Sequence, residues 1–279
     1  MEIRRSEKAG IHITSIKGQD LPIEAEKNVA GVAGLAILKA HNAQLGFEIR
    51  IEKNIKPGSG IGSSAASAAG TVAGINYLLG NPFTNKELIP FAMEGERLAC
   101  GSAHADNVAP ALLGGFTLVR DTNPLDICAL PTPLELVATV IHPKIEVKTA
   151  DARAVLKKRV TLEKAISQWG NVGALVSSLY EEDYDLLSRS LIDGIVEPTR
   201  AILIPHFSEL KAACKEAGAL GSGISGSGPS VFALSRGMPA ANTVAQAMQS
   251  VLEKTNIPFD IHVSPVKKTG VSFIEDLLT

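Results

Sequence analysis

The stretch from Lys56 to Gly70 constrains this chain more than any other feature of its sequence. Three glycines, Gly58, Gly60 and Gly62, precede two serines and a run of small residues that predicts an apolar helix to about Leu79. Glycine allows the backbone to adopt positive φ and to approach a ligand closely. The start of a helix adds unpaired N–H groups and a partial positive charge. The stretch therefore predicts an anion site, and a phosphate is the usual occupant of such a site.

This glycine loop differs from the two common phosphate loops. A Walker A loop requires a lysine directly after its last glycine, and none follows Gly62. A dinucleotide-binding loop requires Gly-x-Gly-x-x-Gly, whereas here the spacing is Gly58-x-Gly60-x-Gly62. The hydroxyls of Ser63 and Ser64 offer one ligand for a phosphate oxygen and one for Mg²⁺, which prefers few protein ligands together with phosphate oxygens and water.

A magnesium site also needs a carboxylate, and two glutamates are candidates. Glu94 and Glu96 lie on a helix expected from about Asn85 to Leu98, which Thr84 and Glu87 begin with the pattern of a capping box. Residues two apart on a helix point in different directions. One glutamate is therefore expected to face inward, and the residues alone leave open which one.

A polar loop at residues 101–110 contains His104, Asp106 and Asn107 among small residues. Polar clusters in loops commonly carry binding or catalysis, so we interpret this one as functional. The other histidines stand alone and are interpreted as structural: His12, His41, His142, His206 and His262.

Further candidates lie in the second half of the chain. Thr149 and Arg153 are four residues apart and would share one face of a helix. Arg200 follows Glu197-Pro-Thr after an expected helix. A guanidinium suits a carboxylate or a phosphate, although each arginine taken singly fits a surface ion pair. A second glycine-rich turn occupies residues 221–229.

Composition excludes several classes of function. A net charge of −2 and an aromatic content of 4% give no reason to expect nucleic-acid binding. The three cysteines form no CxxC pair, so neither a disulfide framework nor a zinc site is indicated. The first residues contain no apolar signal segment, and no apolar run reaches 18 residues. We therefore expect a cytoplasmic protein without a membrane span.

Strands and helices mix without strict βαβα alternation, which favours the α+β class. At 279 residues two domains are plausible, and the prolines at 131–133 suggest the boundary between 1–133 and 134–279. Strands are predicted at 10–16, 47–52, 112–119, 134–142, 230–235 and 259–263, and helices at 28–43, 63–79, 85–98, 150–156, 162–180, 184–195, 207–217 and 239–254.

Taken in order, these motifs resemble the GHMP kinase superfamily and, within it, the homoserine kinases. The glycine–serine loop indicates the superfamily, and the segment His-Ala-Asp-Asn-Val-Ala-Pro indicates the homoserine kinases. The matching stretches cover residues 57–67, 101–116, 148–153, 197–200 and 225–229.

The resemblance implies a two-domain α+β fold, with a ribosomal protein S5 domain 2-like N-terminal domain and a ferredoxin-like α/β sandwich at the C-terminus. It implies ATP-dependent phosphorylation of the L-homoserine hydroxyl, a step towards threonine, with Mg²⁺ as cofactor. It also implies a homodimer.

The resemblance also assigns roles to residues. Ser64 and Glu96 would hold Mg²⁺, which selects Glu96 over Glu94. Ser64, Glu96, Thr149 and Arg153 would form the catalytic set, with no general base expected. The residues expected to bind ATP are Asn28, Pro57, Gly58, Ser59, Gly60, Ile61, Gly62, Ser63, Ser64, Ala65, Ala66 and Ser67. Those expected to bind the substrate are His104, Asp106, Arg153, Arg200, Ser225, Gly226, Ser227 and Gly228.

The chain departs from the family pattern at its start. Family members open with a strand and a loop of the type Pro-Ala-Thr-Ser-Ala-Asn-x-Gly-Pro-Gly-Phe-Asp, which this sequence lacks. Two other hypotheses therefore stand beside the first: a GHMP kinase for a different small alcohol, and a truncated, inactive nucleotide-binding homologue. The pair His104 and Asp106, with Arg153 and Arg200, favours an amino-acid substrate.

Overall fold

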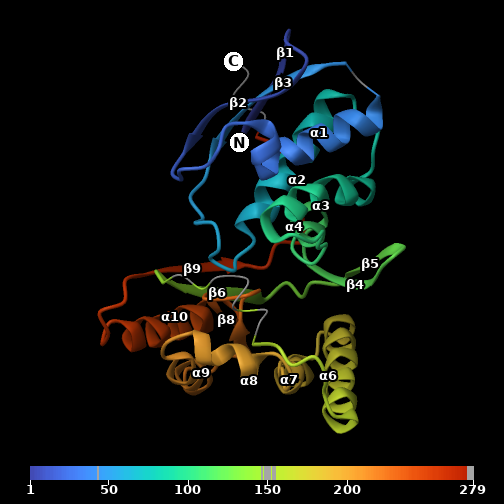
Figure 1. Cartoon of the computed structure of the whole chain (residues 1–279). Helices are drawn as coiled ribbons and strands as arrows, with labels where there is room; N and C mark the ends of the chain where they lie inside the picture. Colours follow the sequence, from blue (N-terminus) through green and yellow to red (C-terminus); the bar gives the residue numbers. More distant parts are fainter. Residues whose placement is uncertain (43, 146, 148–151, 153–154, 275–279) are drawn as a thin grey trace. The chain divides into compact units, whose positions relative to one another are not determined.

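The computed structural model describes residues 1–42, 44–145, 147, 152 and 155–274. The chain forms two compact units (Figure 1). Unit 1 comprises residues 1–57, 62–129 and 267–279, and unit 2 comprises residues 58–61 and 130–266. The two units are described separately.

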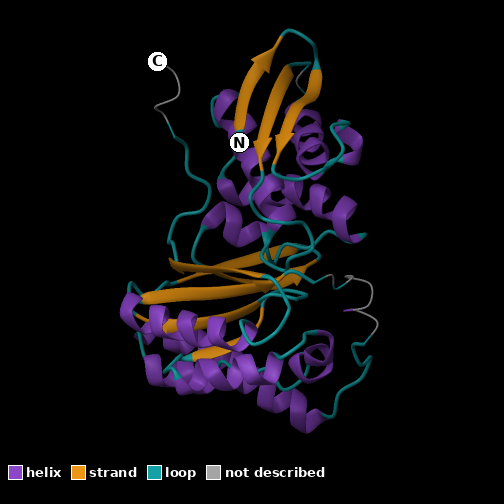
Figure 2. Cartoon of the chain, turned by 90° about the vertical axis from the view of Figure 1, so that its left-hand side faces the viewer, coloured by secondary structure: helices purple, strands orange, loops and turns teal. Residues whose placement is uncertain are grey.

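Unit 1 is built on a three-stranded sheet, which Figure 2 shows beside its helices. The strands β1 (Glu2–Ser6), β2 (Gly10–Lys17) and β3 (Gly46–Glu52) lie in the order β1-β3-β2. The central strand β3 is antiparallel to β1 and parallel to β2. A separate hairpin pairs β4 (Phe116–Thr122) with β5 (Leu125–Leu130).

Four α-helices complete unit 1 in the described part of the chain: α1 (Val29–His41), α2 (Ser63–Leu78), α3 (Asn85–Cys100) and α4 (Val108–Leu113). A 3-10 turn, η1 (Ala25–Lys27), precedes α1. Small residues allow α1, α2 and α3 to lie close together. A Cβ at Gly95 would lie 2.7 Å from the carbonyl oxygen of Val29 and 3.2 Å from Cβ of Ala68. The large buried side chains around them include Ile37, Phe47, Ile49, Ile75, Leu88 and Ile89.

Unit 2 contains an antiparallel four-stranded sheet in the order β7-β8-β6-β9. Its strands are β6 (Leu136–Pro143), β7 (Gly221–Ile224), β8 (Val231–Arg236) and β9 (Phe259–Pro265). The helices α9 (Phe207–Glu216) and α10 (Met238–Leu252) pack on one side of this sheet (Figure 1). The core between helices and sheet includes Ile141, Leu210, Val231, Val244 and Met248.

The remaining helices of unit 2 lie between β6 and α9 in the sequence. They are α6 (Leu162–Glu181), α7 (Tyr184–Ser190), α8 (Glu197–Arg200) and the 3-10 turn η2 (Ala201–Leu203). α6 packs mainly against α7. No helix in the described part of the chain is long and apolar enough to span a membrane.

The predicted α+β class is confirmed, and most predicted elements occur within a few residues of their expected positions. Strand β6 is central, as its apolar sequence indicated. The helix predicted at 150–156, with its cap Thr149, lies largely outside the described residues.

Four local predictions were wrong or incomplete. β1 and β5 were not predicted; β1 carries charged residues that pair with β3, as Arg4 does with Glu48 at 2.6 Å. Part of the predicted turn at 221–229 is strand β7, which pairs with β8. The helix predicted to reach Ile195 ends at Ser190, because the carboxylate of Asp193 accepts the backbone N–H groups that follow it.

The compact units divide the chain differently from the predicted domains 1–133 and 134–279. The division near the middle falls between Ala129 and Leu130, and the segment from Lys267 onward belongs to unit 1. That segment is held by the N–H of Gly115, which donates to the carbonyl of Lys267 at 2.8 Å, and by the stacked rings of Tyr77 and Phe273.

The capping box of α3 gives a direct stability prediction. The N–H of Glu87 donates to the Thr84 hydroxyl at 3.3 Å, and the N–H of Thr84 donates to the Glu87 carboxylate at 2.8 Å. We expect Thr84→Ala to lower the free energy of unfolding by about 1 kcal/mol, as the loss of an N-cap usually does. Urea unfolding measures this, with Thr84→Ser as the control that keeps the cap. Equal losses in both variants would contradict the capping role.

Candidate functional site

In unit 1, the helix α2 begins at the end of the first glycine loop without a side-chain cap. Its N-cap is Gly62, with φ of 74°, so the first N–H groups of the helix have no capping hydroxyl or carboxylate. The first turn is instead held from behind by Lys53, whose ammonium donates to the carbonyl of Ser63 at 2.7 Å and to the hydroxyl of Ser67 at 2.6 Å. The helix start is thus fixed and open to an anion.

Glu96 on α3 is buried beside this helix start, with only 4% of its surface exposed. One of its carboxylate oxygens, Oε1, has no hydrogen-bond partner among the described residues. Burial raises the pKa of Glu96 above its ordinary value, and hydrogen bonding with Ser64 acts in the opposite direction. A buried carboxylate with an unpartnered oxygen is a costly group that a cation would satisfy.

The neighbouring Glu94 has a different environment. It lies at the surface and forms an ion pair with Arg97 at 3.1 Å. Glu96 is therefore the glutamate that faces the interior of unit 1.

His104 and Asp106 lie close enough to Glu96 to affect its pKa. The charge of Asp106 raises the pKa of Glu96, while His104 and Lys53 lower it. Both loop residues are exposed, whereas Ala105 between them is buried and anchors the loop. Unit 1 thus brings together four of the predicted site residues: Ser64, Glu96, His104 and Asp106.

Asn28, expected to contact ATP, has a structural role within unit 1. Its side-chain oxygen accepts the N–H of Ala30 at 3.0 Å and caps α1, and its amide nitrogen donates to the carbonyl of Pro22 at 2.7 Å. It is 5% exposed. The sequence had placed Asn28 inside the helix, which in fact begins one residue later.

In unit 2, the middle of the first glycine loop contacts the second glycine-rich turn. The hydroxyl of Ser225 donates to the carbonyl of Gly60 at 2.9 Å. Gly60 has φ of 82°, and a Cβ there would lie 2.5 Å from the Ser225 carbonyl oxygen and 2.7 Å from that of Gly228. Only glycine fits at this position, because both the backbone angle and the space exclude a side chain.

A buried polar chain supports the same contact. The hydroxyl of Ser230 donates to the carbonyl of Ser59 at 2.6 Å and lies 3.0 Å from Nδ1 of His142. All three residues are buried. The hydroxyl of Ser59 has no hydrogen-bond partner among the described residues. The glycine loop therefore contains a buried polar atom without a partner there, as α3 of unit 1 does at Oε1 of Glu96.

Arg200 is positioned by the loop that follows α7. Its guanidinium donates to the carbonyls of Ala152 and Gly226, each at 3.1 Å. The carboxylate of Asp193 accepts the N–H groups of Ile195, Val196 and Glu197 at 2.9, 2.8 and 3.1 Å and so fixes the start of α8.

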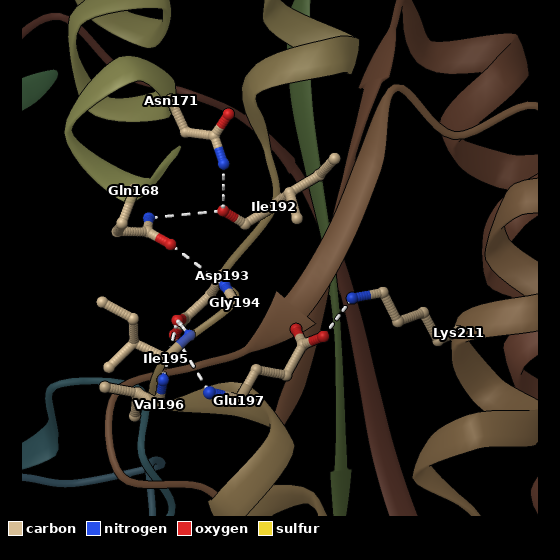
Figure 3. Close-up of polar contacts among 9 residues, drawn as sticks. All are labelled: Gln168, Asn171, Ile192, Asp193, Gly194, Ile195, Val196, Glu197 and Lys211. Carbon is tan, nitrogen blue, oxygen red and sulfur yellow. Dashed lines mark hydrogen bonds and ion pairs between the residues drawn. The ribbon is translucent and has the colours of Figure 1, made fainter. Parts of the chain in front are cut away.

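The helix α6 also bonds the loop between α7 and α8, as Figure 3 shows. The side chains of Gln168 and Asn171 donate to the carbonyl of Ile192 at 3.3 and 3.1 Å, and Gln168 accepts the N–H of Gly194 at 3.0 Å. Glu197 forms an ion pair with Lys211 (Figure 3). These contacts fix the turn that carries Arg200.

A cavity of about 300 Å³ lies within unit 2 beside Arg200. It is lined by α6, the loop after α7, β7 and Phe232. Cavities of this size bind small molecules. Of the other expected site residues, Thr149 and Arg153 lie outside the described residues.

The described residues suit a phosphate and a divalent cation. The uncapped start of α2 fits a phosphate, and the unpartnered oxygen of Glu96 beside Ser64 fits a hard cation such as Mg²⁺. Within the described ranges no three His, Cys, Asp or Glu side chains gather as a metal cage. Mg²⁺ bound mainly by phosphate oxygens and water does not need one.

Comparison with known proteins defines the class. The family of GHMP kinases N terminal domains matches residues 27–115, and that of GHMP kinases C terminal domains matches residues 163–254. The structure of Leishmania major mevalonate kinase in complex with R-mevalonate has a TM-score of 0.68 at 17% identity, which shows a shared fold.

Closer similarity is to homoserine kinases. The homoserine kinase of Chlorobium phaeobacteroides strain BS1 is 47% identical over 97% of this chain and 88% of its own length, and that of Chloroherpeton thalassium is 50% identical over 91% and 82%. The crystal structure of homoserine kinase from Cytophaga hutchinsonii has a TM-score of 0.92 at 52% identity, covering 96% of this chain and 86% of that one. The chain belongs to the homoserine kinases of the GHMP kinase family.

Three contributors to the site were missed from the sequence. Lys53 stands at the end of a predicted strand, next to the glycine loop, and this position was the available signal. Asp193 precedes a glycine, a pair that marks turns, inside a segment predicted as helix. Ser230 contacts residues 88 and 171 positions away, a relation that spacing does not reveal.

The burial of Glu96 predicts how stability depends on pH. Its folded-state pKa is raised above the ordinary value of 4.5, so the native state binds more protons than the unfolded chain between those two values. The contribution of Glu96 to stability is therefore fully present below about pH 4.5 and is lost as pH rises through the folded pKa. Above both values, the buried charge destabilises the protein.

We expect Glu96→Gln to be more stable than the unmodified chain at pH 8 in metal-free buffer, with the difference vanishing towards pH 4. Urea unfolding between pH 4 and 8 measures this. Glu94→Gln, at a partly exposed position two residues away, is the control and should not show this change. If the unmodified chain were more stable than Glu96→Gln at pH 8, the prediction would be wrong, because the folded protein would then stabilise the charged carboxylate.

Proposed function

We propose that the chain catalyses ATP-dependent phosphorylation of the L-homoserine side-chain hydroxyl, giving O-phospho-L-homoserine in threonine biosynthesis. The observation that carries the proposal is the buried Glu96 carboxylate, with an unpartnered oxygen, beside Ser64 at the uncapped start of α2. Similarity to homoserine kinases supports the choice of substrate.

In this proposal, residues 57–67 bind the phosphates of ATP, and Ser64 and Glu96 hold Mg²⁺. When bound, the cation would neutralise negative charge on the phosphate oxygens. Lys53 fixes the first turn of α2 from behind. No general base is assigned, because positioning and charge neutralisation are adequate for phosphoryl transfer.

The substrate roles follow from the chemistry of an amino acid. We assign its ammonium to Asp106, helped by His104, and its carboxylate to Arg153 and Arg200. The network around Asp193 supports Arg200, because it holds the short helix that carries the guanidinium. Asn28, Thr149 and the turn from Ser225 to Gly228 keep the roles that the resemblance implies.

We also infer a cytoplasmic homodimer. The resemblance to the family supports the dimer, and the absence of any CxxC pair among the three cysteines fits a reducing compartment.

The substrate proposal predicts a clear order of activities. In an ADP-release assay with Mg²⁺, we expect turnover with L-homoserine, kcat/KM about 10- to 200-fold lower with L-serine, which is one methylene shorter, and none with mevalonate. Activity on mevalonate without activity on L-homoserine would contradict the proposal.

Glu96→Gln should abolish turnover while L-homoserine still binds by calorimetry; a normal kcat would contradict the magnesium assignment.

The role of Arg200 predicts that Asp193→Ala raises the KM for L-homoserine about tenfold, or about 1.4 kcal/mol, with little change in the KM for ATP. The physical reason is that the segment leading into α8 loses three hydrogen bonds, those from the N–H groups of Ile195, Val196 and Glu197. Steady-state kinetics measure this effect.

The matched control is Asp183→Ala, which removes the cap of α7, where the N–H of Leu186 donates to Asp183 at 2.9 Å. Each variant should lose about 1 kcal/mol of stability. Only Asp193→Ala should change the KM for L-homoserine. Equal KM values in the two variants would mean that Asp193 serves stability alone.

A further inference from the structure

Ser230 lies at the centre of a buried chain of three polar groups in unit 2. Its hydroxyl donates to the carbonyl of Ser59 in the first glycine loop at 2.6 Å and lies 3.0 Å from Nδ1 of His142, near the end of β6. The sheet brings Ser230 and His142 together, because Val231 of β8 pairs with Ile141 of β6, one residue away from each. The chain therefore connects the sheet of unit 2 to the backbone of the loop.

The number of available protons determines the direction of this chain. The carbonyl of Ser59 can only accept, and the hydroxyl of Ser230 has a single proton, which it donates to that carbonyl. The Ser230 oxygen must then accept from the imidazole of His142, so Nδ1 carries a proton. His142 thus donates to Ser230, and Ser230 donates to the loop. Hydrogen bonds in such a series polarise and strengthen one another.

These bonds determine which way the loop backbone faces. The carbonyl of Ser59 accepts from Ser230, and the next carbonyl, that of Gly60, accepts from Ser225 at 2.9 Å. Both peptides are trans, so each N–H lies opposite its C=O. The N–H groups of these two peptides, those of Gly60 and Ile61, therefore point away from the second glycine-rich turn. Neither donates to another residue in the part of the chain that the structure describes.

Two N–H groups presented in this way are donors for an anion. Successive backbone N–H groups in turns rich in positive φ commonly bind phosphate, and Gly58, Gly60 and Gly62 all have positive φ. A peptide whose carbonyl accepts a hydrogen bond is also a stronger donor at its N–H, because the two groups share one polarised system. Both effects fit the phosphate role proposed for residues 57–67.

His142 occupies a position where an apolar side chain is expected. It follows Val140 and Ile141 in a central strand and is 4% exposed, whereas the other histidines among the described residues are half-buried or exposed. Burying a polar ring costs free energy, and an aliphatic side chain would fill the same position without that cost. The bond to Ser230 gives a reason for a histidine here that packing does not.

We propose that His142 and Ser230 are positioning residues of the phosphate-binding loop. They touch no ligand. By holding the carbonyl of Ser59 towards the sheet, they keep the two outward N–H groups available to the phosphates of ATP. This inference deepens the proposed kinase function and rests on its assignment of residues 57–67 to ATP.

Calorimetric titration of the full chain with ATP and Mg²⁺ tests the role of Ser230. Ser230→Ala should raise the dissociation constant of ATP about tenfold, because the loop loses a short buried hydrogen bond. Ser235→Ala is the matched control: its hydroxyl is also buried, lies on β8 and has no hydrogen-bond partner among the described residues. The control should bind ATP as the unmodified chain does. An unchanged dissociation constant in Ser230→Ala, or an equal rise in both variants, would overturn the proposal.

Two substitutions that differ in hydrogen bonding test the role of His142. His142→Leu removes the donor but keeps an apolar side chain, so the dissociation constant of ATP should rise about threefold or more while stability in urea is equal or higher. His142→Asn retains an N–H donor close to the position of Nδ1 and should bind ATP within about twofold of the unmodified chain. Lower stability of His142→Leu with unchanged ATP affinity would mean that His142 serves the fold alone, and would overturn its positioning role.

Failure of the kinase proposal would look different. If the unmodified chain bound ATP but did not phosphorylate L-homoserine, the proposed function would be wrong, and the titrations would still decide the positioning role. Normal turnover with unchanged ATP affinity in both Ser230→Ala and His142→Leu would overturn the positioning role alone. An unmodified chain that does not bind ATP would overturn both. Circular dichroism first establishes that each variant is folded; should Ser230→Ala not fold, His142→Leu decides.

Discussion

The first glycine loop can exist only because Gly60 has no side chain. The carbonyl oxygens of Ser225 and Gly228 would lie 2.5 and 2.7 Å from a Cβ at Gly60, so the second turn and the loop pack backbone against backbone. The hydroxyls of Ser225 and Ser230 then bond the loop carbonyls directly. In the proposed phosphate-binding role, a loop fixed in this way would not have to become ordered when the ligand binds, which would lower the entropic cost of binding.

The candidate site residues of unit 1 carry an electrostatic cost in the folded state. Lys53 and Glu96 are both buried, and burial lowers the pKa of Lys53 and raises that of Glu96. Lys53 is compensated by two neutral acceptors and by the charge of Glu96. Among the residues that the structure describes, Oε1 of Glu96 has no hydrogen-bond partner. A fold that satisfied this oxygen itself would have no carboxylate left for a cation, so the cost and the proposed function are two aspects of one arrangement.

Local sequence signals predicted the parts of the fold that depend on local physics. The small residues of α2, the capping box at Thr84 and the apolar strand β6 each follow from periodicity or short-range hydrogen bonds. The edge strand β1 was missed because its charged residues are stabilised by pairing with β3, as in the contact of Arg4 with Glu48. The end of α7 was missed because the Asp193 carboxylate accepts N–H groups that a longer helix would have used, such as that of Ile195. The Asp-Gly pair at this position did mark a turn.

The candidate site was predictable to the extent that its residues form contiguous motifs. The loop from Pro57 to Ser67 and the segment containing His104 and Asp106 were proposed as site residues from the sequence, and these roles remain predictions. The residues that hold these segments in place were not predicted, because they are far apart in the sequence. Ser230 bonds both His142 and Ser59, and Gln168 bonds the carbonyl of Ile192. Sequence spacing thus indicates candidate binding groups more readily than the groups that hold them in place.

The helix α6 was predicted at 162–180 and occurs at Leu162–Glu181, but its periodicity did not reveal which side chains contact the rest of unit 2. An amphipathic helix is expected to bury its apolar face and to expose its polar face. In α6 the amides of Gln168 and Asn171 bond inward to the loop that positions α8, while Trp169 and its apolar neighbours face solvent. The inward amides therefore have a structural use: through them α6 fixes the loop between α7 and α8, and with it the backbone that carries Arg200.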